Sequence, residues 1–352
     1  MAGVVATAVH ATGQALRLGV YYGAARLLAR QLPAPPTAPA ASGAAPRETA
    51  SRPTAGLREM VADIAGLLRE DAAGVRAGIY PPMADEPALL DWVSRMRAMF
   101  ADAPAAFARR TTRDATTAET ADPAAALPDY YRQDFHFQTG GYLTDDSARL
   151  YDAQVETLFM GSAELMRRAA LRELLDALAG RDQRRVQVAD IACGTGRLLR
   201  QMRLAMPAAT LSGVDLSRAY LDEARRHLGN LRPVAWLEGN AEGLPFADAS
   251  LDAATCVYLF HELPPVVRQT VARELARVLK PGGTLVFMNS LQLGDRPDYD
   301  RILEQFPVRF HEPYYRNYII DDLDDVFSAA GLEARSHRHA FLSKVMVRQK
   351  RA

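Results

Sequence analysis

The chain has 352 residues, 49% of them hydrophobic and 24% charged, which is enough to bury one large core and to carry an accessory segment. Lysine plus arginine equals aspartate plus glutamate at 42 each, so no overall basic field favours nucleic acid, and no nucleic-acid partner is expected. The two cysteines, Cys193 and Cys256, lack metal-ligand spacing, which indicates a reducing, cytoplasmic location.

The N-terminal segment, residues 1–55, is apolar and basic, and acidic residues are absent until near its end. Its arginines follow the apolar run instead of preceding it, which argues against a signal peptide. Arg17 also shortens that run below the ~20 residues of a spanning helix. Residues 1–32 could form a helix that docks on a protein partner or on the inner membrane, where Arg17, Arg26 and Arg30 would attract acidic lipid. They could instead form a loosely packed helix without a role, and both interpretations stay open.

A linker rich in proline and alanine, Leu32 to Ala55, leads into a helical accessory region expected over residues 56–145. Apolar residues recur there at three- and four-residue steps, first from Leu57 to Leu68 and again from Pro87 to Arg109. The segment Asp129 to Asp152 then gathers many aromatic residues. Aromatic side chains in such a glycine-containing loop can cap a ligand or merely fill the space between helices and sheet, and both interpretations stay open.

Helices and strands alternate through the remaining part, residues 146–352, which is expected to form the main domain. The pattern predicts strands at 186–190, 210–215, 233–237, 253–258 and 284–289, with helices at 197–206, 217–228 and 265–279. This order predicts an α/β fold of the Rossmann-like, doubly wound type, with a mostly parallel sheet and an N-terminal helical extension. A ligand of such a sheet binds at the carboxyl ends of the strands.

The segment VADIACGTGRLL, from Val188 to Leu199, joins the first expected strand to a helix through a glycine-rich turn. Its last residue, Leu199, stands where a dinucleotide-binding turn has glycine or alanine, so a pyrophosphate clamp is disfavoured. Asp215 ends the second expected strand, where a carboxylate can accept hydrogen bonds from both ribose hydroxyls. After the third strand, Asn240 could read an adenine edge while Leu216 packs on its face. These residues together suit adenosine without a diphosphate.

The chain resembles the class I S-adenosylmethionine-dependent methyltransferases. The resemblance rests on four segments in that family's order: VADIACGTGRLL, LSGVDLSRAYLDEARRHL, GNAEGLPFADASLDAATCVYLFHELP and RVLKPGGTLVFM. Within the family the chain is similar to the ubiquinone/menaquinone-biosynthesis C-methyltransferase group. Its long N-terminal extension and the segment Phe306 to Tyr318 are not features of those compact enzymes, so a quinone substrate does not carry over.

The resemblance implies S-adenosylmethionine as the cofactor and residues 146–352 as the methyltransferase domain. Asp190 and the turn that follows would hold the methionine end, Asp215 the ribose, and Asn240 with Ala241 the adenine. The complete set of expected cofactor-binding residues is Asp190, Ala192, Cys193, Gly194, Thr195, Gly196, Asp215, Leu216, Asn240, Ala241 and Tyr258.

The expected reaction is C- or O-methylation of a small hydrophobic or aromatic acceptor. In-line transfer from the activated sulfonium can proceed through positioning and desolvation alone. Where the acceptor must lose a proton, His261 is the candidate base, because its loop faces the cofactor's sulfur in this fold and histidine titrates near neutrality. His261 could instead cap the next helix or pack structurally, and Glu262 could orient it or face water. The loop residues expected to contact the acceptor are His136, Tyr142, His311 and Tyr314.

Other functions stay open beside this one. A protein that binds S-adenosylmethionine without methylating, either as a cyclase or lyase or as an assembly factor, would need the same cofactor residues. A nicotinamide-dependent oxidoreductase is disfavoured by the missing third glycine. His337 and His339 share a strand face but have no third ligand in view, so no metal is expected.

Overall fold

The computed structural model describes residues 2–31, 54–83, 89–116 and 127–351. Its centre is a seven-stranded sheet in the order β3-β2-β1-β4-β5-β7-β6. The strands are β1 (Gln187–Ile191), β2 (Thr210–Asp215), β3 (Ala235–Glu238), β4 (Leu251–Val257), β5 (Leu279–Ser290), β6 (Leu332–Ala340) and β7 (Ser343–Lys350).

Strands β1 to β5 pair in parallel, while β7 is antiparallel to both β5 and β6. The predicted mostly parallel, doubly wound sheet is therefore confirmed. Because the five parallel strands end at one edge, the loops after β1, β2, β3 and β4 gather there.

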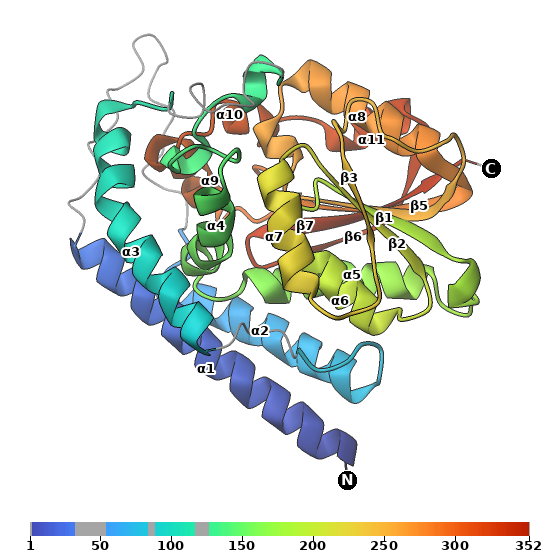
Figure 1. The fold of residues 1–352 in the computed structure, drawn as a ribbon, viewed down its shortest axis with the longest axis horizontal. Coiled ribbons are helices and arrows are strands. Elements are labelled where there is room, and N and C mark those ends of the chain that lie inside the picture. The colour runs from blue at the N-terminus through green and yellow to red at the C-terminus, as the bar shows by residue number, and fades with distance from the viewer. Residues whose placement is uncertain (1, 32–53, 84–88, 117–126, 352) are drawn as a thin grey trace.

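Helices cover both faces of the sheet, as Figure 1 shows: α5 (Ala163–Ala177) and α6 (Arg197–Ala205) lie on one face, and α8 (Pro265–Val278) and α11 (Leu323–Ala329) on the other. A further helix, α7 (Arg218–Leu228), packs against β2 and β3. Four successive residues of β5, from Leu285 to Met288, are buried, which is expected of a strand covered on both faces.

Among the described residues, four helices come before α5 in the sequence: α1 (Ala2–Gln31), α2 (Leu57–Arg76), α3 (Leu89–Thr112) and α4 (Asp145–Leu158). The predicted helical periodicity from Leu57 to Leu68 is confirmed, although only part of it faces the core. Ile64 and Leu67 are buried, whereas Leu57 and Val61 are exposed. Most of the expected linker lies outside the described residues.

Helix α1 is anchored by a buried hydrogen bond and a buried ion pair. His10 Nε2 lies 2.6 Å from an oxygen of Asp71 in α2, and the other Asp71 oxygen accepts a hydrogen bond from Arg168 of α5. Arg17 is buried and lies 2.8 Å from Glu156 of α4. The loosely packed alternative for this helix is therefore wrong.

The expectation that Arg17 attracts acidic lipid is also wrong, because its guanidinium is committed to Glu156 inside the protein. Among the described residues, no helix is long and apolar enough to cross a membrane.

Candidate active site

The turn after β1 carries three residues with positive φ: Ala192 (57°), Gly194 (54°) and Gly196 (73°). The two glycines serve different purposes. A Cβ added at Gly196 would lie 2.9 Å from the Ala224 Cβ of α7, so Gly196 lets two helices pack closely. A Cβ added at Gly194 would meet no atom within 4 Å. The open space beside Gly194 is what the close approach of a ligand requires.

Asp215 ends β2 beside this turn. One of its oxygens accepts a hydrogen bond from the Gly194 N–H at 2.8 Å, and the other accepts from the Ser217 N–H at 2.9 Å. Burial raises the pKa of the Asp215 carboxyl to about 6, against the lowering effect of these donors. A carboxylate offers about four lone-pair sites, so the ionised Asp215 side chain can accept further hydrogen bonds beside those from the backbone.

Asp190 lies inside the sheet, where its Oδ1 accepts a hydrogen bond of 2.5 Å from the Thr255 hydroxyl of β4. Burial is the main cause that raises the pKa of Asp190 to about 7. The carboxyl group is almost fully covered by protein, and it borders the cavity described next without lining it.

A cavity of about 50 Å³ opens at the carboxyl ends of the parallel strands. Of the predicted cofactor residues, Ala192, Asp215, Leu216, Asn240 and Ala241 line it. The remaining six do not: Asp190, Cys193, Gly194, Thr195, Gly196 and Tyr258.

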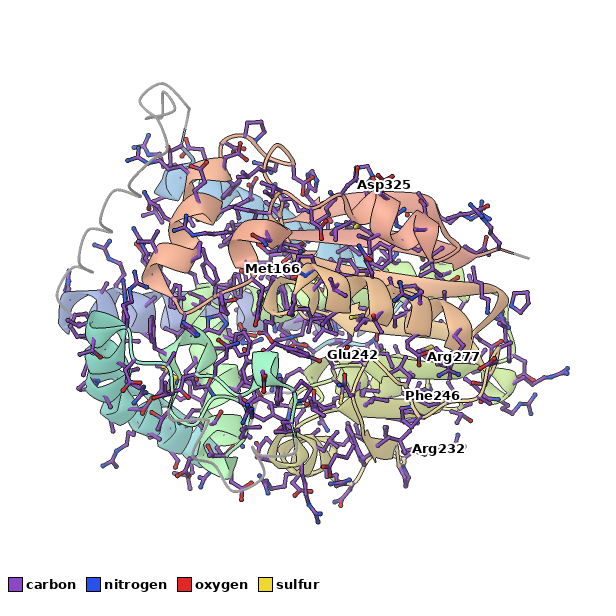
Figure 2. The ribbon with its side chains drawn as sticks, turned by 90° about the horizontal axis from the view of Figure 1, so that it is seen from above. Met166, Arg232, Glu242, Phe246, Arg277 and Asp325 are labelled. Atoms are coloured by element: carbon purple, nitrogen blue, oxygen red, sulfur yellow. The ribbon has the colours of Figure 1, made fainter. Side chains whose placement is uncertain are left out.

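Aromatic residues of the segment 129–142 form the opposite wall of this cavity, namely Tyr130, Tyr131 and Phe135. The Tyr130 hydroxyl donates a hydrogen bond of 2.6 Å to Glu242, which lies in the loop after β3 (Figure 2). Asn240 Oδ1 accepts from the Glu242 N–H at 2.9 Å and so shapes the same loop. We call residues 129–142 the capping segment, because it covers the cavity from the side away from the sheet.

His261 follows β4 in a short 3-10 turn, Phe260–Glu262. Its Nδ1 lies 2.6 Å from Asn289 Oδ1, and that oxygen also accepts the Ser290 N–H at 2.9 Å. Because the backbone donor identifies Oδ1 as the acceptor, His261 donates through Nδ1–H and keeps a free lone pair on Nε2. Burial lowers the pKa of His261 below its ordinary value, which favours this neutral form.

The expected alternative of helix capping by His261 is wrong, since Pro264 is the N-cap of α8 and no side chain caps that end. The neighbouring Glu262 lines the cavity and accepts a hydrogen bond of 2.6 Å from the Tyr142 hydroxyl. Burial and the nearby charge of Glu312 raise the pKa of Glu262 well above its usual range. Tyr142, one of the predicted acceptor residues, is thus brought to the site through Glu262.

The other three predicted acceptor residues separate in the structure. His136 Nε2 lies 3.0 Å from Glu312 Oε1, and these two side chains approach His261. His311 turns its ring to Gln133, with Nε2 2.7 Å from that amide oxygen, and contributes its backbone carbonyl to the His136 N–H. Tyr314 offers its carbonyl oxygen to Arg268 of α8.

The predicted cofactor residue Tyr258 lies behind His261 instead of in the cavity. Its hydroxyl is 2.6 Å from Ser343 Oγ, and its ring meets the His261 ring edge to face at 6.3 Å. The φ of 57° at Tyr258 turns the chain sharply at the end of β4 and so aims the next residues at the cavity.

Four residues near His261 were missed from the sequence: Asn289, Glu312, Tyr315 and Tyr318. The rings of Tyr315 and Tyr318 lie 6.0 and 6.2 Å from the His261 ring. Three of the four lie in the tyrosine-rich segment Phe306 to Tyr318, whose composition could have indicated a contribution to the site. Its short, irregular helices leave no periodicity from which to choose the residues that face the site.

Comparisons with known proteins identify the family of this chain. A family described as a methyltransferase domain matches residues 188–283. The ubiquinone/menaquinone biosynthesis C-methyltransferase of Desulfotalea psychrophila is 34% identical over 178 residues, 51% of this chain and 68% of that protein. The demethylmenaquinone methyltransferase of Beutenbergia cavernae is 37% identical over 142 residues, 40% of this chain and 54% of that protein.

Among solved structures, a SAM-dependent methyltransferase from Aquifex aeolicus is 18% identical and aligns with a TM-score of 0.38, over 51% of this chain and 88% of that one. Of the two curated relatives, the match covers 68% of the first and 54% of the second. With that extent of identity to a curated C-methyltransferase, the chain belongs to the class I S-adenosylmethionine-dependent methyltransferases, and S-adenosylmethionine is its cofactor.

Proposed function

We propose that this methyltransferase acts on a small aromatic or conjugated molecule that carries a hydroxyl group, and that it methylates carbon or oxygen. The observation that supports this most directly is the position of His261 and Glu262. Glu262 lines the same cavity as Asp215, and His261, one residue away, keeps a free Nε2 among aromatic rings. A planar, apolar acceptor suits such a surface, with a few polar groups to orient it.

In this proposal Asp215 holds the ribose of the cofactor, and Asn240 with Ala241 lies against the adenine. The acceptor places its reacting atom in line with the methyl–sulfur bond. The acceptor's electron pair forms the new bond to the methyl carbon, the bond to sulfur breaks, and sulfur keeps that pair as a thioether. The proton that the acceptor loses passes to the Nε2 lone pair of His261.

The curated relatives support an aromatic acceptor, because their names refer to ubiquinone, menaquinone and demethylmenaquinone. A hydroquinone ring has both the hydroxyl group and the planar shape that this site suits. Family membership also argues against the nicotinamide-dependent oxidoreductase. The remaining rivals are a member of the family that cyclises or cleaves its cofactor and one that binds the cofactor as an assembly factor.

The capping segment is proposed to open when the cofactor binds. Sites for molecules of drug size measure about 300 to 1,000 Å³, whereas this cavity has about 50 Å³. The wall formed by Tyr130, Tyr131 and Phe135 is the side of the cavity that does not come from the ends of the strands. Movement of this wall would enlarge the cavity without disturbing the sheet.

We further propose that α1 rests on an anionic membrane surface. Its exposed apolar side chains, Val5, Val9, Leu16, Val20 and Leu27, are all more than a third accessible. At the helical repeat they fall within an arc of about 60°. Helix α1 has no acidic residue, and the exposed Arg26 and Arg30 add positive charge near its end, which complements acidic lipid.

The methyltransferase proposal is tested in two steps. Calorimetry on the full chain should give stoichiometric binding of S-adenosylmethionine and S-adenosylhomocysteine. Incubation with a series of hydroquinones and related phenols should then yield S-adenosylhomocysteine and an acceptor heavier by one methylene, both detected by mass spectrometry. Methylthioadenosine in place of both products would support the rival that cleaves the cofactor.

A further inference from the structure

Three side chains from distant parts of the sequence converge beside the cavity. His136 comes from the capping segment, His261 from the turn after β4, and Glu312 from the segment between α9 (Asp300–Arg309) and α10 (Tyr315–Tyr318). One ligand atom of each, a histidine nitrogen or a carboxylate oxygen, lies within 4.8 Å of the other two. Two histidines and one carboxylate are a common set of ligands for divalent transition metals.

The carboxylate of Glu312 is the least explained group in this cluster. Its side chain is completely buried, and neither oxygen has a hydrogen bond of acceptable geometry to any described residue. Within the part of the chain that the structure describes, no lysine or arginine pairs with Glu312 or with the nearby Glu262. Of the two carboxyl groups only Glu262 has a donor, the Tyr142 hydroxyl. A buried carboxylate without a cation or a donor, as at Glu312, is costly, and a bound cation would remove that cost.

The contact between His136 and Glu312 fits two ligands of one ion better than a hydrogen bond. Nε2 and Oε1 are 3.0 Å apart, yet the geometry of a hydrogen bond is not met. Neighbouring ligands of one ion with bonds of about 2.1 Å lie about 3 Å apart, and both point at the ion instead of at each other. The full spread of 4.8 Å is wider than the separation of about 3.4 Å between two tetrahedral ligands, so bound metal would shorten the widest separation by about 1.4 Å.

The surroundings hold both histidines in place for coordination. Asn289 accepts the Nδ1–H of His261, which leaves Nε2 as the lone pair that faces the cluster. The His136 ring packs edge to face against both Phe306 and Phe310, at centroid distances of 5.9 and 5.7 Å. The φ of 57° at His136 is fixed partly by the hydrogen bond from its N–H to the His311 carbonyl. Such outer partners are what orient histidine ligands in metal sites.

We propose that His136, His261 and Glu312 bind one divalent transition-metal ion, of the Zn²⁺ or Fe²⁺ class, on the acceptor side of the cofactor cavity. This inference rests on the proposed function and narrows its substrate class. Three protein ligands leave positions open for an oxygen of the acceptor, which must then be an enol, phenol or ketone next to the atom that is methylated.

In this arrangement His261 acts on the acceptor through the ion instead of taking the proton directly. Coordination lowers the pKa of the acceptor hydroxyl, and its proton passes to solvent. The electron pair of the resulting anion forms the bond to the methyl carbon while the carbon–sulfur bond breaks. The ion keeps its oxidation state, so the step needs no oxidant or reductant.

The test measures metal binding, not activity. Full-length protein is freed of metal with a chelator and titrated with Co²⁺, followed by visible absorption, and with Zn²⁺ in competition with a chromogenic chelator. We expect one ion per chain. Glu312→Gln keeps the shape of the side chain but removes its charge, and it should weaken binding at least tenfold, as should His136→Asn.

His339→Gln is the matched control, because His339 lies on β6, outside the cluster, and its ring nitrogen is 3.9 Å from the carboxylate of Asp295. This variant should bind metal like the wild type. S-adenosylhomocysteine affinity, measured on the same samples, tests the cofactor site separately and should not change. Absence of stoichiometric metal binding by the wild type, or wild-type affinity in both Glu312→Gln and His136→Asn, would overturn the metal site even if the cofactor binds normally.

Discussion

The Tyr130 hydroxyl and the Glu242 carboxylate are joined by a hydrogen bond of 2.6 Å that ties the capping segment to the loop after β3. That loop is itself held to α8, where Arg277 donates to the backbone carbonyl of Phe246 at 2.9 Å. The bond therefore links a wall without strand support to a firmly held part of the cavity.

Tyr130→Phe should speed the release of the cofactor, because it removes this bond and leaves the ring in place. A hydrogen bond to a charged group contributes about 1.5 to 3 kcal/mol, so an increase of roughly tenfold in the dissociation rate is expected. Stopped-flow fluorescence with S-adenosylhomocysteine would measure it. An unchanged dissociation rate would mean that the capping segment does not control the release of the cofactor.

Asp215→Ala should weaken binding of S-adenosylmethionine at least tenfold, because two hydrogen bonds to a charged acceptor are lost together. Isothermal calorimetry measures the change directly. Comparable affinity in the variant and the wild type would rule out the ribose assignment.

The same carboxylate predicts a pH dependence of binding. Hydroxyl donors favour the ionised form of Asp215, whose pKa burial raises to about 6. Affinity should therefore be full above that pH and fall, by up to tenfold per unit, as the pH drops below it. Asp215→Asn cannot titrate and should lose this part of the pH profile, measured by calorimetry between pH 5 and pH 8. If the profile survives in Asp215→Asn, another group is responsible.

Gly194→Val should abolish cofactor binding while the protein remains folded, since the side chain would fill the open space beside the turn. Gly180→Val is a closely matched control. Gly180 has a φ of +77° and, like Gly194 at +54°, no atom within 4 Å of an added Cβ, but it follows α5 away from the cavity. Both variants should lose similar thermal stability, and only Gly194→Val should lose binding. Retained binding in Gly194→Val would show that close approach at this turn is not required.

Most of the sheet could be predicted because its signals are local. Strand β2 was expected at residues 210–215 and is observed there, since a short apolar run ends at an aspartate and is followed by a helix start. The cavity residues Asp215 and Asn240 were found for the same reason. They follow strands directly, and parallel strands bring their ends together.

Residues that meet only through tertiary packing could not be predicted in this way. Glu312 approaches His261 because the α9–α10 segment folds back over the turn after β4, and no sequence period records that contact. For Arg17 the sequence predicts exposure, whereas the structure shows burial. An isolated arginine in an apolar helix suggests exposure, but its partner Glu156 belongs to another helix, so the sequence alone does not indicate the buried pair.

His261→Gln should lower turnover about 10²-fold or more, whether the imidazole takes the proton itself or holds an ion, while S-adenosylhomocysteine binding stays unchanged. Glutamine approximates the size of the ring and can still bond to Asn289. Steady-state kinetics with any identified acceptor, together with calorimetry, separates the two effects. Turnover within a few-fold of the wild type would assign His261 a structural role.

The last prediction concerns α1 and lipid. Val9→Ser together with Leu16→Ser should reduce binding to anionic vesicles at low salt at least tenfold. Burial of each apolar side chain in the membrane interface would contribute about 1.5 to 3 kcal/mol to the free energy of binding. Both are exposed in the protein, at 68% and 70%, so folding should be unaffected. Val266→Ser, at 72% exposure on α8, is the control for a lost surface valine and should bind like the wild type.

Point variants are a better test than removal of the whole helix. A chain that begins at Gly56 would leave Asp71 without its hydrogen bond to His10 and Glu156 without Arg17. Removal of one partner from a buried ion pair, as at Glu156, costs about 3 to 5 kcal/mol. Loss of vesicle binding in such a chain could follow from partial unfolding alone. Co-sedimentation of the full-length variants with vesicles avoids this problem. Arg26→Gln together with Arg30→Gln would measure the electrostatic part of the binding free energy, about 1 kcal/mol for each arginine. Wild-type protein that stays in the supernatant with anionic vesicles would exclude the membrane contact and leave the methyltransferase assignment intact.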